Sequence, residues 1–338
     1  MTPLPMPDAI VAHAETDEGH VLPVIDVTHP LFALADDPES LAVSAEAYRD
    51  SEQRGARIPA FVTRLMLRLA ARRSLLIRAL VHPHAGYLDG LSTYILKLGA
   101  HNLPSPFNSD IDRRLAATPQ VVAMRLRLQQ TARLIAEGLE PHLDAAPGAP
   151  LHLLNIGGGP AIDSLNALIL LKQARPEAPA RPITVHVLDL DTAGPRFGAA
   201  ALEALRTADG PLAGMDVTFS HDTYDWNAAA ALDGFVRQAA ADGAILAASS
   251  EGALFEYGSD DAIVANLKAL HAGGTGVKLA VGSVTRADRF RRRTIMTGGF
   301  NLVPRGVDGF APLAGQGGFD IARIEAAPIS DQVLLRPR

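Results

Sequence analysis

The spacing of hydrophobic and polar residues changes near residue 150. From there on, apolar runs of five to eight residues alternate with longer stretches in which apolar residues recur every three or four positions. The short runs are typical of buried strands and the longer stretches of helices packed on one face. The expected strands are residues 151–156, 183–190, 216–221, 244–248 and 277–283, and the expected helices between them are 161–174, 195–206, 226–241 and 260–272.

The end of the chain breaks this alternation. Residues 319–326 and 332–336 both have the pattern of strands, and no helical stretch separates them. Repeated strand–helix units predict an α/β fold, and two strands joined by a short turn pair in antiparallel fashion. The pattern therefore predicts a doubly wound, mostly parallel Rossmann-like sheet with an antiparallel C-terminal strand.

The first part of the chain is predicted to be mainly helical. Helices are expected at residues 42–54, 58–80, 88–98 and 118–139, with a short strand at 21–27. Arg64, Arg68 and Arg72 recur every four residues, so they share one helix face, which we expect to be solvated or paired between domains. The small-residue, proline-broken stretch 145–150 is the expected boundary.

Two regions follow from this boundary. Residues 1–148 are expected to form an N-terminal mainly helical region that covers a substrate site or forms a dimer interface. Residues 149–338 are expected to form a ligand-binding domain around the sheet. A homodimer is therefore a candidate assembly.

Composition narrows the classes of protein. The chain has 338 residues, 48% of them hydrophobic, and a net charge of −6. Nucleic acid is not expected as a partner, because a general nucleic-acid binder needs a basic field. The absence of cysteine excludes disulfides, thiolate-ligated metals and cysteine nucleophiles. Five arginines interrupt the most apolar stretch, 61–80, so we expect a protein that does not enter a membrane. Because the first residues lack a signal-peptide pattern, we expect it to be cytoplasmic.

A glycine-rich turn follows the first strand of the C-terminal part. Asn155 lies in the strand, Gly157, Gly158 and Gly159 form the turn, and Pro160 follows where a helix begins. Glycine allows left-handed torsions and lets a ligand approach the main chain without meeting a Cβ atom. Such a turn above the first strand of an open α/β sheet is typical of a nucleotide-like ligand site.

Acidic, aromatic and polar residues stand at the ends of the next strands. They are Asp189, Leu190 and Asp191 after the second strand, Asp225 and Trp226 after the third, and Ser249 at the end of the fourth. Together with the glycine motif and the C-terminal hairpin, this order resembles the class I S-adenosylmethionine-dependent methyltransferases over residues 150–338. The resemblance implies S-adenosyl-L-methionine as the cofactor.

The resemblance also implies roles for these residues. The glycine turn, with Asn155 and Ser249 beside it, would contact the ribose and methionine portions of the cofactor. A carboxylate accepts two strong hydrogen bonds from a ribose diol, which favours Asp189, with Asp191 as the second choice. Asp225 suits the adenine amino group.

Trp226 and Leu190 would supply apolar faces for the adenine ring. The chain departs from the family in two places. Asn155 stands where the family often has an acid, and Gly159 lies 30 positions before Asp189, more than the roughly 20 of a compact dinucleotide unit. The choice between Asp189 and Asp191 therefore stays open.

Residues after the fourth strand are candidates for substrate contact and catalysis. Glu251 and Phe255 are expected to contact the acceptor, and Glu256 or Tyr257 to transfer a proton, unless this stretch is an ordinary loop. His221 is a further candidate base, although methyl transfer from a sulfonium does not require one.

Three residues of the helical region are also expected at the acceptor site. His84, Tyr87 and Tyr94 belong to a polar, aromatic stretch that could cover the cofactor. No metal is expected, because His82 and His84 have no third ligand fixed by spacing.

The sequence thus predicts a methyltransferase that modifies an oxygen, nitrogen or carbon atom of a small molecule. An NAD(P)-dependent oxidoreductase is the alternative, but Ile162 stands where the dinucleotide motif has its third glycine. A non-catalytic binding module on the same fold is the other alternative.

Overall fold

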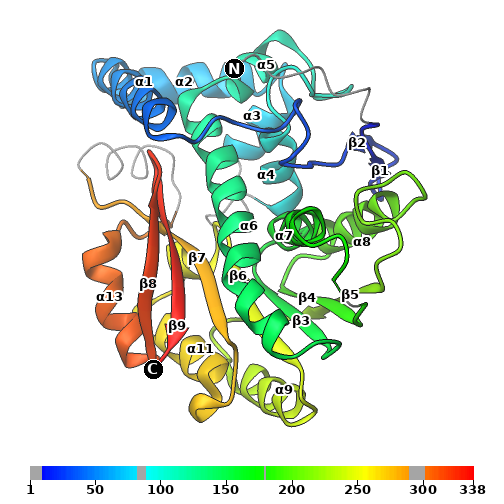
Figure 1. The fold of residues 1–338 in the computed structure, drawn as a ribbon. Helices are drawn as coiled ribbons and strands as arrows, with labels where there is room; N and C mark the ends of the chain where they lie inside the picture. The colour runs from blue at the N-terminus through cyan, green and yellow to red at the C-terminus, as the bar shows by residue number, and fades with distance from the viewer. Residues whose placement is uncertain (1–9, 82–88, 179, 289–300) are drawn as a thin grey trace.

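The computed structural model describes residues 10–81, 89–178, 180–288 and 301–338, and the part after residue 150 is built around a seven-stranded sheet (Figure 1). Across the sheet the strands lie in the order β5-β4-β3-β6-β7-β9-β8. Their bounds are β3 Leu151–Ile156, β4 Ile183–Asp189, β5 Val217–Thr223, β6 Ile245–Ser250, β7 Leu279–Thr285, β8 Phe319–Ala326 and β9 Ser330–Pro337.

The sheet is doubly wound. The strands from β5 to β7 pair in parallel, whereas β9 pairs antiparallel with both β7 and β8. The predicted mostly parallel sheet with an antiparallel C-terminal strand is therefore confirmed. Because β3 lies between β4 and β6, the strand order reverses beside it, and open α/β sheets bind ligands at such a reversal, beyond the carboxyl ends of the strands.

Helices cover both faces of the sheet. One apolar core contains residues of α6, α7 and α8, and the other contains residues of α9, α11 and α13. Leu153 belongs to the first core and Leu154 to the second, because successive strand residues point to opposite faces. The bounds of these helices are α6 Pro119–Ala145, α7 Ile162–Ala174, α8 Ala193–Leu205, α9 Ala230–Ala241, α11 Asp260–His271 and α13 Gly306–Gln316.

The N-terminal region is mainly helical, as predicted, with a short hairpin at its start. Its elements are β1 His13–Glu15, β2 Val21–Pro23, α1 Pro38–Ala56, α2 Ala60–Ala70, α3 Leu75–Val81, α4 Gly90–Lys97 and α5 Asp110–Ala116, followed by α6. Helix α6 runs from this region along the sheet and packs against α7, β7 and β9 (Figure 1). The helical region is therefore joined to the sheet through an extensive apolar contact.

The structure corrects several helix boundaries. The single helix expected over 58–80 is wrong, because the chain forms two helices, α2 and α3, with a break between them. At this break the Ser74 hydroxyl accepts a hydrogen bond from the Ile77 main-chain N–H (2.9 Å) and donates one to Asp112 (2.5 Å). The helix expected from residue 226 begins at Ala230. Helices α5 and α13 and the short α10, Leu254–Tyr257, were not predicted.

No helix in the described ranges combines the length and the apolar character needed to cross a membrane.

Candidate active site

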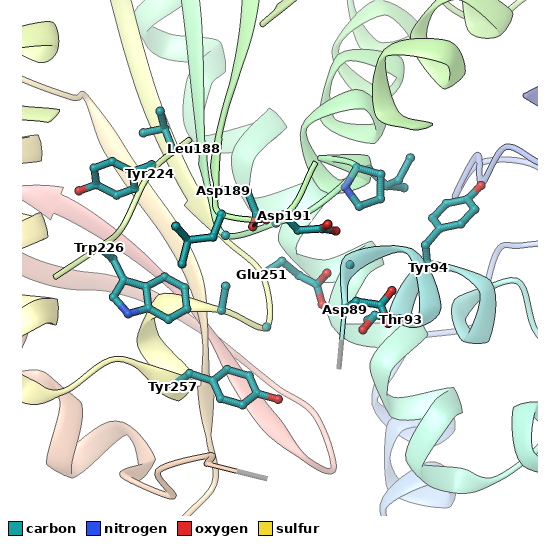
Figure 2. A pocket seen from close by; sticks show the side chains of 18 of the residues that line it. Asp89, Thr93, Tyr94, Leu188, Asp189, Asp191, Tyr224, Trp226, Glu251 and Tyr257 are labelled. Carbon is teal, nitrogen blue, oxygen red and sulfur yellow. Dashed lines mark hydrogen bonds between the residues drawn. The ribbon is translucent and has the colours of Figure 1, made fainter. Parts of the chain in front are cut away.

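A cavity of about 550 Å³ lies at the carboxyl ends of β3, β4, β5 and β6. Its lining combines the turns after these strands with α4 and α6 of the N-terminal region, and Figure 2 shows many of its side chains. The lining residues are Asp89, Gly90, Thr93, Tyr94, Lys97, Arg127, Gly157, Gly158, Pro160, Ile162, Leu188, Asp189, Leu190, Asp191, Tyr224, Asp225, Trp226, Asn227, Glu251, Gly252, Ala253 and Tyr257.

Two residues of the glycine turn (residues 157–159), Gly157 and Gly158, line one side of the cavity. Gly157 and Gly159 have φ angles of 67° and 55°, which residues with a Cβ atom rarely adopt. A Cβ atom on Gly159 would lie 2.9 Å from the Cα atom of Gly90, and one on Gly194 would lie 2.9 Å from the Cα atom of Gly159. Three segments thus meet main chain to main chain, so the start of α4 rests directly on the turn.

Asn155 supports this turn from behind. Its side chain is buried and donates hydrogen bonds to Asp163 Oδ1 (2.7 Å) and to the Ser249 hydroxyl (3.0 Å). Burial, together with the nearby charge of Glu251, raises the pKa of Asp163 to about 6. Oδ2 of Asp163 has no hydrogen-bond partner in the described part of the chain. Neither Asn155 nor Ser249 lines the cavity, so the structure places both as supports of the turn.

Two carboxylates stand at the end of β4. Asp189 accepts hydrogen bonds from the main-chain N–H groups of Gly159 and Asp191, both at 2.9 Å. Burial raises the pKa of Asp189, and these two hydrogen bonds offset part of that effect. Asp191 accepts hydrogen bonds from the N–H groups of Ala193 and Gly194, both at 3.2 Å, and so caps the start of α8. Both carboxylates face the cavity, and Asp189 lies nearer the glycine turn.

An aromatic and apolar wall faces these carboxylates. The ring of Trp226 lies over the turn, because a Cβ atom on Gly157 would come within 2.8 Å of it. Leu190 is 58% exposed beside the cavity. Asp225 Oδ1 accepts hydrogen bonds from the main-chain N–H (2.9 Å) and the side chain (2.8 Å) of Asn227. This wall offers a flat apolar surface with a carboxylate at its edge.

A buried ion cluster, made of Lys97, Arg127, Glu251 and Glu256, closes another part of the cavity. Lys97 and Arg127 each form an ion pair with Glu251, and Arg127 also pairs with Glu256 (3.2 Å). Burial alone would raise the pKa of Glu251, but Arg127 and Lys97 hold it below its usual value. Burial disfavours the charged Arg127 guanidinium, and the two glutamates more than compensate, so its pKa is raised. Each shift favours the charged form, so Glu251 and Arg127 stabilise each other as an ion pair.

The structure brings ten of the predicted site residues into the lining. They are Gly157, Gly158, Asp189, Leu190, Asp191, Asp225, Trp226, Tyr94, Glu251 and Tyr257. Tyr94 presents its ring, because its buried hydroxyl donates to the Pro23 carbonyl (2.5 Å) and accepts from the Ile25 N–H (3.1 Å).

Six predicted residues lie outside the lining: Asn155, Gly159, His221, Ser249, Phe255 and Glu256. His221 Nε2 forms a hydrogen bond with the main-chain carbonyl of Asp189 (3.0 Å). Phe255 packs in the core against Phe310, with ring centroids 4.8 Å apart. The Glu256 carboxylate forms an ion pair with Arg127 (3.2 Å). His84 and Tyr87 lie outside the described residues.

The two cations of the lining, Lys97 and Arg127, had no predicted role. For Lys97 a signal was present, since it is the one cation in the mostly apolar stretch 90–98, which is a costly place for a charge without a partner. Arg127 lies between Arg125 and Arg133, so no local pattern distinguishes it. In the described ranges, no three histidine or acidic side chains are grouped as they would be around a metal ion.

Neither a protein-family description nor a curated protein matches the sequence. Among solved structures, the fold is similar to a possible exported protein from Bordetella parapertussis, with 18% identity, coverage of 90% of this chain and 99% of that chain, and a TM-score of 0.53. This likeness shows a shared fold and no more.

Two methyltransferases are among the weaker matches. One is an O-methyltransferase from neocarzinostatin biosynthesis in complex with S-adenosyl-L-homocysteine and 1,4-dihydroxy-2-naphthoic acid (18% identity, 74% of this chain and 69% of that chain, TM-score 0.36). The other is N,N-8-amino-8-demethyl-D-riboflavin dimethyltransferase from Streptomyces davawensis (14% identity, 92% and 74%, TM-score 0.37). At these scores neither supports an argument about this chain's activity.

Proposed function

We propose that this protein is an S-adenosyl-L-methionine-dependent methyltransferase that acts on a small-molecule acceptor. The main support is the cavity, which lies at the carboxyl edge of a doubly wound sheet with an antiparallel C-terminal strand. Most of the charged groups that line it are carboxylates. Five carboxylates and two cations line it. Such a field favours a cationic ligand, and the cofactor's sulfonium is a cation.

The residues present fit the adenosine part of this cofactor. Each oxygen of Asp189 already accepts one main-chain N–H, and a carboxylate oxygen can accept a second hydrogen bond. Asp189 therefore retains capacity for a ribose diol, and Asp191 stands beside it. We place the adenine ring against Trp226 and Leu190, with Oδ2 of Asp225 available to its amino group.

The cofactor would supply an activated methyl group, so the chain's own task is alignment and the exclusion of water. We place the acceptor beside Tyr257, the last residue of the short helix α10, which lines the cavity (Figure 2). Glu256 and His221 do not line the cavity, so we assign them no proton transfer. Glu256 acts through Arg127 and is a positioning residue.

The same lining disfavours a nicotinamide dinucleotide. A dinucleotide brings an anionic pyrophosphate to the glycine turn, where main-chain N–H groups normally bind it. Here the Gly159 N–H already donates to Asp189, whose carboxylate would repel the phosphates. A non-catalytic binding module would use the same lining, so methyl transfer itself separates that alternative from the proposed enzyme.

Three further expectations belong to this proposal. Residues 149–338 would be the catalytic domain and residues 1–148 the cap over its site. A cytoplasmic location and a homodimer remain predictions.

Titration calorimetry with S-adenosyl-L-methionine, S-adenosyl-L-homocysteine and NAD tests the proposal, with Asp189→Ala as the variant. Loss of hydrogen bonds to a charged group should weaken cofactor binding by about 1.5–3 kcal/mol. Asp209→Ala is the matched control, because Asp209 is exposed and lies outside the cavity. A melting curve for each protein separates loss of binding from loss of fold.

Binding of NAD alone would overturn the proposal. Binding of S-adenosyl-L-homocysteine without methyl transfer to any acceptor would favour the non-catalytic module. Unchanged cofactor affinity in Asp189→Ala would transfer the ribose role to Asp191.

A further inference from the structure

The helical region contributes two cationic side chains to the cavity. Lys97 ends α4 and Arg127 lies within α6, and both reach Glu251 at the end of β6. The three side chains are only 9%, 6% and 6% exposed, yet all three line the cavity. Residues 1–148 and the sheet therefore build this part of the site together.

The two cations have donors to spare. The Lys97 ammonium has three N–H bonds, and Glu251 is its one acceptor within the described residues. Arg127 uses Nε for Glu251 and Nη1 for Glu256, whereas its Nη2 lies over Gly252. A Cβ atom on Gly252 would come within 2.4 Å of Nη2, so only glycine leaves room for the guanidinium at this place in the lining.

Glu251 has acceptor capacity to spare as well. Its two oxygens each accept from one cation, and an ionised carboxylate has about four acceptor positions. In the view of Figure 2, Glu251 lies between Trp226 on one side and Asp89 and Thr93 on the other. The unused donors and acceptors are thus at one place, beside the wall that we assign to adenosine.

We propose that Lys97, Arg127 and Glu251 form a subsite for an α-amino acid group, namely the methionyl end of the cofactor. The cofactor's carboxylate binds Lys97 Nζ and Arg127 Nη2, and its ammonium binds Glu251. The inference rests on the proposed function, since it takes the adenosine part to lie at Asp189 and Trp226.

Charge balance supports an amino acid over a simple anion. The buried ion cluster has two positive and two negative groups, so it is neutral as it stands. A zwitterion leaves the buried site neutral, whereas a lone carboxylate or phosphate would add uncompensated charge at a desolvated position, which is costly.

Two ligands that differ only at this end test the subsite. S-Adenosyl-L-homocysteine has the amino acid group, and 5′-methylthioadenosine has the same adenosine and thioether sulfur without it. Calorimetry should show that Lys97→Met weakens binding of S-adenosyl-L-homocysteine by about 10- to 100-fold, the loss of a hydrogen bond to a charged group. Binding of 5′-methylthioadenosine should change by less than about twofold. Lys97→Arg, which keeps the charge, is the matched control and should retain most of the affinity.

A structural role for Lys97 gives a different result. If the residue only joins α4 to the sheet, Lys97→Met weakens both ligands alike, and that outcome overturns the inference. If Lys97→Met does not fold, the neutral pair Lys97→Met with Glu251→Gln removes both charges and should show the same selective loss. If the wild-type protein binds neither ligand, the proposed function itself fails.

Discussion

Replacing Asp163 with asparagine should stabilise the protein increasingly as the pH rises from about 4 to 7. The Asp163 carboxyl is buried behind the glycine turn, where Asn155 donates to Oδ1 and Oδ2 has no partner among the described residues. Burial and the charge of Glu251 raise its pKa from the usual 3.8 to about 6. The folded protein therefore favours the protonated acid.

The size of the effect follows from this pKa difference. A group whose pKa is raised on folding contributes its full stability below the unfolded value and loses it as the pH rises through the folded value. Each unit corresponds to about 1.4 kcal/mol, so ionising Asp163 costs about 3 kcal/mol of stability between pH 4 and pH 6. Asparagine avoids this cost, because it keeps the acceptor for Asn155 and never ionises.

Urea unfolding of both proteins at pH 4, 5, 6 and 7 measures the difference. His186 acts in the opposite direction in both proteins, because burial and His152 lower its pKa to about 4, so stability falls as the pH drops below the usual value of 6.5. Subtracting the two curves removes this shared contribution. Asp209→Asn, at an exposed position, should show no such trend. A difference between wild type and Asp163→Asn that stays flat or shrinks with rising pH would refute the reasoning.

Two glycine substitutions test the packing around the cavity. Gly90→Ala places a Cβ atom 2.9 Å from the main chain of the glycine turn, so it should cost about 1–3 kcal/mol and weaken S-adenosyl-L-homocysteine binding. Gly234→Ala lies in a helix and places its Cβ atom where nothing lies within 4 Å, so it should instead raise the free energy of unfolding by about 0.5–1 kcal/mol. If chemical unfolding shows similar changes for the two variants, Gly90 does not contact the glycine turn. Gly252→Ala and Gly214→Ala both introduce a side chain at positive φ, but only the first meets Arg127, so it should lose about 1–3 kcal/mol more. Equal losses would mean that Arg127 does not lie against the main chain there.

The sheet could be predicted from the sequence because its strands are buried on both faces or paired through a short turn. The strands 151–156 and 319–326 were located without error. The break at Ser74 was missed because its cause, a hydrogen bond to Asp112, joins residues 38 positions apart. Helix α13 was missed because glycine and proline interrupt its sequence, and its apolar face is recognisable only against α11 and β8.

The candidate site was predictable in part for a similar reason. Asp189 ends β4 and Trp226 lies shortly after β5, so both must lie at the sheet's carboxyl edge once the fold is parallel. Glu256 and Phe255 follow a strand too, but the short α10 turns them inward, which no local pattern indicates.

By itself, the sequence determined the parallel sheet, its antiparallel end and the glycine turn, because periodic burial and glycine torsions are local properties. Only the tertiary structure decided which charges meet. Lys97, Arg127 and Glu251 come from three elements far apart in the chain, and each would be too costly to bury without the others. Their pairing depends on the packing of α4 and α6 against the sheet. The same packing gives the proposed subsite its charged side chains and its zero net charge.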